Sequence, residues 1–192
     1  WELQDMLMGS LYDTNCGLFM AQTAEKLAKK YNIDRGAQDE FANRSHSLGA
    51  AAVKSGRFAD EIVPVEIRKG DKVVGKVDTD DHIKPDTTLE GLSKLRPAFG
   101  EGGTVTAGNA SGIVDGAAAL IVTTGEHAKA MGWKPRARIA AWATVGVEPS
   151  EMGIGPAPAI RAVLKQTGIA QDQIDYFEIN EAFSAQYLAV EK

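Results

Sequence analysis

The chain contains 192 residues, of which 44% are hydrophobic and 24% charged, a balance typical of globular proteins with one or two domains. Its net charge of −5 argues against nucleic acid as a partner, because phosphate binding needs a basic face. No apolar run approaches the roughly 18 residues of a membrane helix, so we expect no membrane span. The single cysteine, Cys16, excludes an internal disulfide, and its distance in sequence from the histidines argues against a metal site.

Helical patterns and one hairpin are predicted in the first hundred residues. Apolar residues recur at i, i+3, i+4 and i+7 within residues 20–31, which predicts an amphipathic helix. A second helix should begin after Asp34, a good N-cap residue, and end before Gly56. Two β-rich runs joined across residues 69–71 predict a hairpin, and the sequence TTLE at residues 87–90 predicts a capping box that opens a short helix.

Strand-like and helix-like segments alternate after the glycines near residue 103. The segments predicted as strands are TVTAG (104–108), AAALIV (117–122), ARIAAWATVGV (137–147) and DYFEIN (175–180). Helices are predicted before Gly132 and before Gly168, since glycine commonly ends a helix. Apolar strands that alternate with helices indicate a sheet buried on both faces, and therefore an α/β fold.

Three short motifs favour ordinary structure over chemistry. Residues 70–76 match G-x-x-x-x-G-K, but Val77 follows where a phosphate-binding loop needs Ser or Thr, and the match lies inside the predicted hairpin. The sequence GIGPAPAI at 153–160 lacks the third glycine of a dinucleotide fingerprint, so we interpret it as a turn leading into a helix. A nucleophilic role for Cys16 would need a nearby base, and no histidine has a clear link to it.

Two segments carry candidate functional residues, each with a structural alternative. The small residues at 107–112 would let a ligand approach the backbone closely, and Ser111 offers a hydroxyl; alternatively, Asn109 or Ser111 caps a following helix. Asn180 follows a predicted strand and could aim its amide at a developing oxyanion, directly or through water. The alternative there is an N-cap, with Glu181 favourable to the helix dipole.

Several strings together resemble the thiolase family of acetyl-CoA acetyltransferases and 3-ketoacyl-CoA thiolases. They are GTVTAGNASGIVDGAAALIV, MGIGPAPAI, INEAFSAQYLAVEK, KLRPAF and GRFADEIVPV. The resemblance implies a five-layered αβαβα fold built from two similar halves, with a mainly helical loop domain inserted in the first half. It divides the chain into the loop domain (residues 1–103), the end of the N-terminal half (104–134) and the beginning of the C-terminal half (135–192).

The resemblance also implies site residues. Asn180 is similar to the asparagine that holds an oxyanion-hole water, and Glu181 to a residue that orders the catalytic network. Residues similar to those that contact the substrate or coenzyme A (CoA) are Met20, Lys84, Phe99, Ala107, Gly108, Ser111, Met152 and Phe183. No cofactor is implied, because CoA and acyl-CoA thioesters are substrates.

The family's nucleophilic cysteine, its Gly-His-Pro histidine and its Cys-x-Gly cysteine have no counterpart in the chain. Thioester attack needs a thiolate and a base, so we expect the isolated chain to be inactive. The resemblance implies that the parent enzyme cleaves 3-ketoacyl-CoA with CoA, giving acetyl-CoA and a shortened acyl-CoA in fatty-acid β-oxidation. The alternatives are an acetoacetyl-CoA thiolase, a non-catalytic CoA-binding module, and a piece that contributes strands to a partner thiolase subunit.

Assembly and location follow only from the resemblance. Sheets that lack strands expose their edges, so we expect other polypeptide or a swapped assembly to complete them. The family is typically dimeric or tetrameric, which implies a homo-oligomer. The location implied is the cytoplasm of a bacterium or the mitochondrion, and any targeting segment would lie outside the 192 residues.

Overall fold

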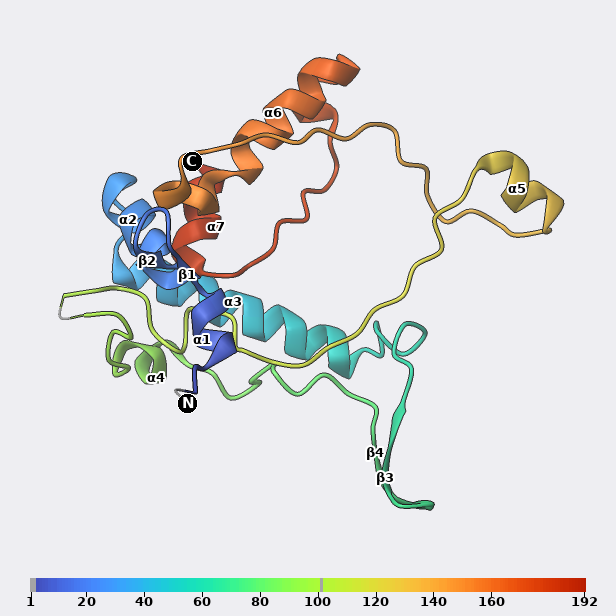
Figure 1. Ribbon diagram of the computed structural model, residues 1–192, viewed down its shortest axis with the longest axis horizontal. Helices are drawn as coiled ribbons and strands as arrows, with labels where there is room; N and C mark the ends of the chain where they lie inside the picture. The colour runs from blue at the N-terminus through green and yellow to red at the C-terminus, as the bar shows by residue number, and fades with distance from the viewer. Residues whose placement is uncertain (1–2, 101) are drawn as a thin grey trace.

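A computed structural model describes residues 3–100 and 102–192 of the chain (Figure 1). The strands form two hairpins: β1 (Tyr12–Asp13) with β2 (Leu18–Phe19), and β3 (Val65–Lys69) with β4 (Lys72–Val77). The helices are α1 (Met6–Ser10), α2 (Met20–Lys30), α3 (Arg35–Lys54), α4 (Leu89–Ser93), α5 (Gly125–Ala130), α6 (Pro156–Thr167) and α7 (Ser184–Glu191), with 3-10 helices η1 (Pro149–Ile154) and η2 (Gln171–Gln173).

The two longest N-terminal elements, α2 and α3, begin and end close to where the sequence predicts. Asp34 caps α3, its Oδ1 accepting a hydrogen bond from the Ala37 N–H at 2.8 Å. Gly56 follows the helix with a φ of 74°, a left-handed conformation that favours glycine after a helix end. Both predicted helices are therefore confirmed. The signals at the ends of α3 are local and need no tertiary partner.

The predicted hairpin is also confirmed, whereas the predicted capping box is displaced by one residue. Strands β3 and β4 are antiparallel, and Gly70 turns between them with a φ of 60°. Helix α4 is capped by Thr88, whose hydroxyl accepts from the Gly91 N–H at 3.1 Å. Glu90 therefore does not reach back to the cap as the capping box requires, and pairs instead with Lys94.

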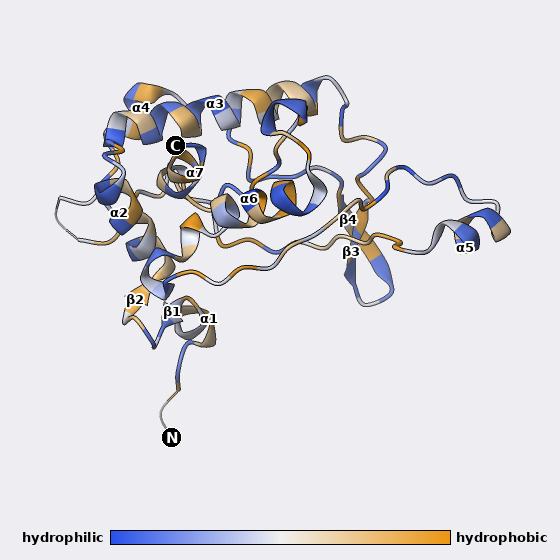
Figure 2. Cartoon of the chain, turned by 90° about the horizontal axis from the view of Figure 1, so that it is seen from above, coloured by the Kyte–Doolittle hydropathy of each residue, from blue (hydrophilic) through white to orange (hydrophobic). Residues whose placement is uncertain are grey.

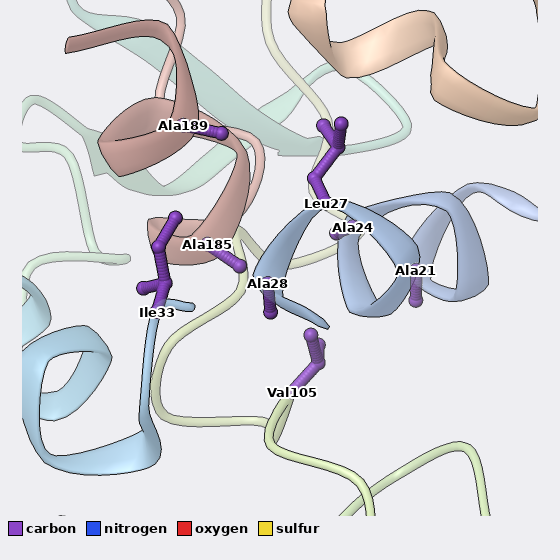
Figure 3. Close-up of a cluster of buried hydrophobic side chains, with 8 residues drawn as sticks. All are labelled: Ala21, Ala24, Leu27, Ala28, Ile33, Val105, Ala185 and Ala189. Atoms are coloured by element: carbon purple, nitrogen blue, oxygen red, sulfur yellow. The ribbon is translucent and has the colours of Figure 1, made fainter. Parts of the chain in front are cut away.

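The core lies where α2 and α7 pack together, near the middle of the compact part of the molecule (Figure 3). Its side chains are mostly alanines, so the two backbones approach closely, and Leu27 is fully buried between them. Val105 brings in the segment that follows residue 103. The cluster consists of Ala21, Ala24, Leu27, Ala28, Ile33, Val105, Ala185 and Ala189.

The four segments predicted as strands after residue 103 form no hydrogen-bonded ladder within the described residues. They form no regular secondary structure; the Val105 carbonyl accepts from the Ala98 N–H at 2.9 Å, and beyond the four segments an isolated bridge joins Ala110 to Phe183. Two of them lead to α5 and back, so that α5 stands far from the rest of the molecule (Figure 1). Several apolar side chains of the last three segments face solvent, with Leu120 92% and Tyr176 92% exposed, whereas Val105 of the first segment is buried. Figure 2 shows hydrophobic residues along these connections.

This exposure has a direct physical explanation. A strand buried on both faces needs neighbours that satisfy its backbone groups and helices that cover its side chains. The described residues place no such neighbour beside residues 111–124 or 137–147. The apolar segments and the helices that alternate with them, as in an α/β fold, are thus present in the chain. Among the described residues, however, these segments do not pair into a sheet.

Among the described residues, no helix has the length and apolar character needed to cross a membrane.

Candidate functional site

Two segments that are far apart in the sequence cross at the candidate site. The Ser111 N–H donates to the Ala182 carbonyl at 2.9 Å, and the Ser184 N–H donates to the Asn109 carbonyl at 2.9 Å. This pair of bonds forms the antiparallel bridge between Ala110 and Phe183. The structure therefore joins the glycine-rich turn (residues 107–112) to the Asn-Glu-Ala-Phe motif (residues 180–183). These are the two segments in which the sequence predicts functional residues.

Asn109 is a buried cross-link and caps no helix. Its Oδ1 accepts from the Thr106 N–H at 2.8 Å, while its Nδ2 donates to the Thr104 carbonyl and to Asp39 Oδ1, each at 3.0 Å. The prediction that Asn109 or Ser111 caps a following helix is wrong, because residues 111–124 are extended. The amide instead closes the turn on itself and fastens it to α3.

The approach to this turn is fixed by one carboxylate from α2. Glu25 accepts hydrogen bonds from the Thr104 N–H and the Val105 N–H, both at 2.7 Å, and from the Thr104 hydroxyl at 2.8 Å. Gln38 on α3 adds a bond from its Nε2 to Thr104 Oγ1 at 2.9 Å. Bonds from backbone N–H groups to a charged acceptor are among the stronger hydrogen bonds in proteins, so α2 and α3 together hold the turn in place.

Gly108 occupies a position where a side chain has no room. A Cβ at this residue would collide with the side chains of Leu92 and Leu95 on and after α4. Arg35 in turn donates from Nη2 to the carbonyl oxygens of Leu92, at 2.5 Å, and Leu95, at 3.1 Å. The glycine thus lets the turn and α4 come together, as expected where two backbones approach closely.

A small cavity of about 110 Å³ opens beside the crossing. Three of the predicted site residues line it: Gly108, Ser111 and Glu181. His46 and His82 also line it. Their positions, 36 residues apart, carry no motif from which a shared site could have been found.

Glu181 is held in place by a hydrogen bond from α3. The Ser45 hydroxyl donates to Glu181 Oε2 at 2.5 Å, across 136 residues of sequence. Asp39 and Ser45 lie six positions apart on α3, about one and two-thirds turns of helix. Helix α3 therefore supports both the glycine-rich turn and the Asn-Glu-Ala-Phe motif, through side chains at different angles around its axis.

The two histidines each accept a hydrogen bond from a backbone N–H. His46 Nδ1 accepts from Lys84 at 3.2 Å, and His82 Nε2 accepts from Gly112 at 3.0 Å. The ring centroids are 6.5 Å apart. Burial lowers the pKa of His46 below its ordinary value, and the neighbouring His82 and Lys84 lower it further, while Glu181 acts in the opposite direction.

Asn180 does not cap the final helix, so that interpretation is wrong. Helix α7 begins at Ser184 with Phe183 in the cap position, three residues after Asn180. The antiparallel bridge at Phe183 keeps the intervening residues extended and delays the helix. Asn180 is exposed, and its amide is therefore accessible for the oxyanion role.

Four other predicted residues do not line the cavity. Ala107 adjoins Gly108 and is exposed, Met20 begins α2, and Met152 lies 46% exposed in η1, which packs on α2. Lys84 reaches the site through its backbone bond to His46, while its Nζ donates to the Asp81 carbonyl at 2.8 Å.

Phe99 lies elsewhere. It packs against Phe19, with ring centroids 6.0 Å apart, and lines a separate open hollow together with Lys29 and Asp34. The structure does not bring it into the cavity beside Ser111.

Cys16 also lies away from the cavity. It is half-buried in the turn between β1 and β2, where its N–H donates to Asp13 Oδ1 at 3.3 Å. No cysteine is among the residues that line the cavity. Within the part of the chain that the structure describes, no group of three or more His, Cys, Asp or Glu residues is arranged to hold a metal ion.

Chemically, the site offers hydrogen bonds. It combines a serine hydroxyl, backbone groups of a glycine-rich turn, a fixed carboxylate and two imidazoles. The exposed amide of Asn180 adjoins Glu181 in the sequence but does not line the cavity. Such a set can bind and orient a chain that carries amide groups and can support an oxyanion.

Known proteins are similar to this chain over nearly its whole length. The model of the thiolase N-terminal domain matches residues 1–126, and that of the thiolase C-terminal domain matches residues 133–192. An acetyl-CoA acetyltransferase of Thiocystis violacea is 50% identical over 193 residues, which cover 99% of this chain and 48% of that protein. The chain thus spans about half the length of this curated relative.

Two solved structures are similar to the whole chain. The Bacillus anthracis acetyl-CoA acetyltransferase matches with a TM-score of 0.95 and 47% identity, covering 100% of this chain and 48% of that one. Human mitochondrial 3-ketoacyl-CoA thiolase in complex with CoA matches with a TM-score of 0.92 and 45% identity, covering 99% and 47%. With the two domain models, these matches show that the chain has an α/β thiolase-like fold and belongs to the thiolase family.

Proposed function

We propose that the chain is the central part of a thiolase-type acyltransferase, in which it holds the CoA arm and part of the oxyanion site. The observation that carries this proposal is the bridge between Ala110 and Phe183, since it brings the glycine-rich turn and the Asn-Glu-Ala-Phe motif into one site. The parent enzyme would use CoA to cleave 3-ketoacyl-CoA, giving acetyl-CoA and a shortened acyl-CoA.

In this proposal the site residues divide into two groups. Ser111, with Ala107 and Gly108, faces the pantetheine arm, to which the exposed Ser111 and Ala107 are accessible. Asn180 holds the oxyanion water, and Glu181, fixed by Ser45, orders the neighbouring groups. No further cofactor is required, because CoA is itself a substrate.

Two alternatives share this site. An acetoacetyl-CoA thiolase would use the same contacts on a shorter substrate, and the Thiocystis and Bacillus relatives, both acetyl-CoA acetyltransferases, favour it. A non-catalytic CoA-binding module would keep the contacts without the chemistry. Assay of the full-length gene product with acetoacetyl-CoA and with a long-chain 3-ketoacyl-CoA separates all three, by a higher kcat/KM for one substrate or by no turnover.

We further propose that the isolated chain is inactive. A thiolase needs a thiolate at the thioester, and the only cysteine lies in the turn before β2, outside the cavity. Loss of the thioester absorbance of acetoacetyl-CoA on incubation with the purified chain and CoA would contradict this proposal.

Binding to CoA tests the proposed site directly. Calorimetric titration of the chain with millimolar CoA should release heat, and Ser111→Ala should weaken the affinity about fivefold through loss of one hydrogen bond. Ser47→Ala is the matched control, because the Ser47 hydroxyl bonds only within α3, to the Asn43 carbonyl at 2.8 Å. Absence of heat with the unmodified chain would overturn the CoA-holding role.

Assembly and location complete the proposal. The unpaired segments with exposed apolar side chains after residue 111 favour assembly with other polypeptide. The partner would be a second copy of the chain, in a dimer or tetramer, or another thiolase polypeptide. Sedimentation velocity distinguishes these assemblies from a monomer. We place the protein in the cytoplasm of a bacterium or in the mitochondrion, in line with the bacterial relatives and the human mitochondrial thiolase.

A further inference from the structure

We propose that His46 and His82 form a latch of two neutral imidazoles in opposite tautomers, which holds the backbone at Lys84, positions Ser111 at the cavity and opens in acid. The latch is defined by two bonds, from the Lys84 N–H to His46 Nδ1 and from the Gly112 N–H to His82 Nε2. Neither histidine belongs to the CoA contacts proposed above, so the latch is a separate feature of the chain.

The hydrogen bonds determine which nitrogen carries the proton in each ring. A neutral imidazole has one acceptor and one donor nitrogen, and a backbone N–H needs the acceptor. His46 must therefore carry its proton on Nε2, and His82 must carry its proton on Nδ1. The two rings are held in opposite tautomers although they lie within 6.5 Å of each other.

The latch links three parts of the chain, in addition to the bond from Asn109 to Asp39 that fastens the turn before Ser111 to α3. His46 lies on α3, His82 and Lys84 lie on the loop after β4, and Gly112 follows Ser111 in the extended segment. A Cβ at Gly112 would collide with the His82 ring, so the imidazole packs directly on that backbone. Ser111 is thereby fixed from both sides, by the bond to the Ala182 carbonyl and by the latch at the next residue.

Protonation breaks each bond by removing its acceptor. An imidazolium carries N–H groups on both nitrogens, so a backbone N–H would then face another donor. The charged groups that face the pair are Glu181, from the segment before α7, and Lys84, with Asp81 beside it in the same loop. The lowered pKa of His46 agrees with this arrangement, because the latch holds the neutral ring. His82 is exposed, so solvent protons reach it directly.

The first test reads the tautomers. Long-range ¹H–¹⁵N spectra of the 192-residue chain at about pH 8 should show the proton of His46 on Nε2 and that of His82 on Nδ1. Identical tautomers, or averaged signals from both rings, would overturn the latch. His127, which packs against Trp133 near α5, supplies the third signal for assignment.

The second test follows the amides that the latch holds. Between about pH 8 and pH 5, the exchange protection factors of the Gly112 and Lys84 amides should fall about fivefold, the worth of one net hydrogen bond. His82→Gln offers an amide oxygen near the place of Nε2 and does not titrate, so it should keep Gly112 protected at both pH values. His82→Leu should lose the protection at both.

His127→Gln is the matched control, and it should behave as the unmodified chain. A Gly112 protection factor that does not change with pH, or a His82→Gln variant that falls as the unmodified chain does, would overturn the proposal. These amides report on the latch whether or not CoA binds. Failure to bind CoA with an intact latch would therefore count against the proposed function alone.

Discussion

Asn109 donates a hydrogen bond to Asp39 across 70 residues of sequence, at 3.0 Å, and both side chains are buried. The same carboxylate accepts from Arg35 Nε at 2.8 Å, so it carries an ion pair on one side and the turn on the other. A buried carboxylate that is satisfied in this way specifies one position for the glycine-rich turn. Residues far from the proposed CoA contacts thereby determine where those contacts lie.

Removing the Asn109 amide should destabilise the chain strongly. Asn109→Ala leaves the Thr106 N–H and the Thr104 carbonyl without a partner and takes one donor from Asp39, so we expect a loss of about 2–3 kcal/mol. Urea unfolding measures this loss. Asn15→Ala, at an exposed position, is the control and should stay within about 0.5 kcal/mol. Equal effects of the two substitutions would show that the cross-link is unimportant.

A methyl group at Gly108 should force α4 away from the turn. Gly108→Ala places a Cβ against the side chains of Leu92 and Leu95, and overpacking of this kind costs about 1–3 kcal/mol. Gly116→Ala is the matched control, since no atom lies within 4 Å of its added Cβ. Thermal unfolding should show a lower midpoint for Gly108→Ala alone, and an unchanged midpoint would contradict the close packing.

The carboxylate of Glu25 should be essential for the approach to the turn. Glu25→Gln removes the charge that strengthens the bonds from the Thr104 and Val105 N–H groups and replaces the oxygen that accepts from the Thr104 hydroxyl by a donor, so we expect a loss of about 1.5–3 kcal/mol. Glu40→Gln, exposed on α3, removes the same charge without these contacts. Chemical unfolding of both variants at neutral pH isolates the effect of the hydrogen bonds, and matching losses would refute it.

Stability should decline in mildly acidic solution through His46. Its pKa is lower in the folded chain, so the unfolded chain takes up the proton first. The contribution of this residue is fully present above its ordinary pKa near 6.5 and is lost as the pH falls through the lower folded value. His46→Asn should flatten the dependence of the urea midpoint on pH, whereas His127→Gln should not; parallel profiles for all three proteins would contradict this assignment.

The elements that sequence alone predicts are those whose signals are local. Asp34 and Gly56 bound α3 through contacts within one turn of the helix, and Gly70 determines the hairpin turn by its own φ. The segments predicted as strands after residue 103 are a different case. A hydrogen-bonded ladder needs two paired segments, and the sequence of one segment does not identify its partner. Their extended backbone could be predicted, but the absence of a ladder could not.

The candidate site divides in the same way. Ser111, Gly108 and Glu181 come together as the motifs indicate, whereas His46, His82, Asp39 and Ser45 had no sequence signal. These four act through partners between 30 and 136 residues away, and periodicity within a single helix does not reveal such partners. The cap assigned to Asn180 failed for a related reason, since the distant bridge at Phe183 sets where α7 begins.

The packing of α2 against α7 closes the chain into a ring. Leu27 and Ala185 belong to the same buried cluster, Lys192 Nζ bonds to the Tyr31 carbonyl at 2.7 Å, and the Ala110–Phe183 bridge adds a second closure. Residues 111–124 and 133–148 form the part of that ring that has no regular secondary structure, and α5 connects them. A single proteolytic cut in this part of the chain would leave two fragments that the core holds together. The molecule therefore has the architecture of a protein that can be reassembled from two complementary fragments.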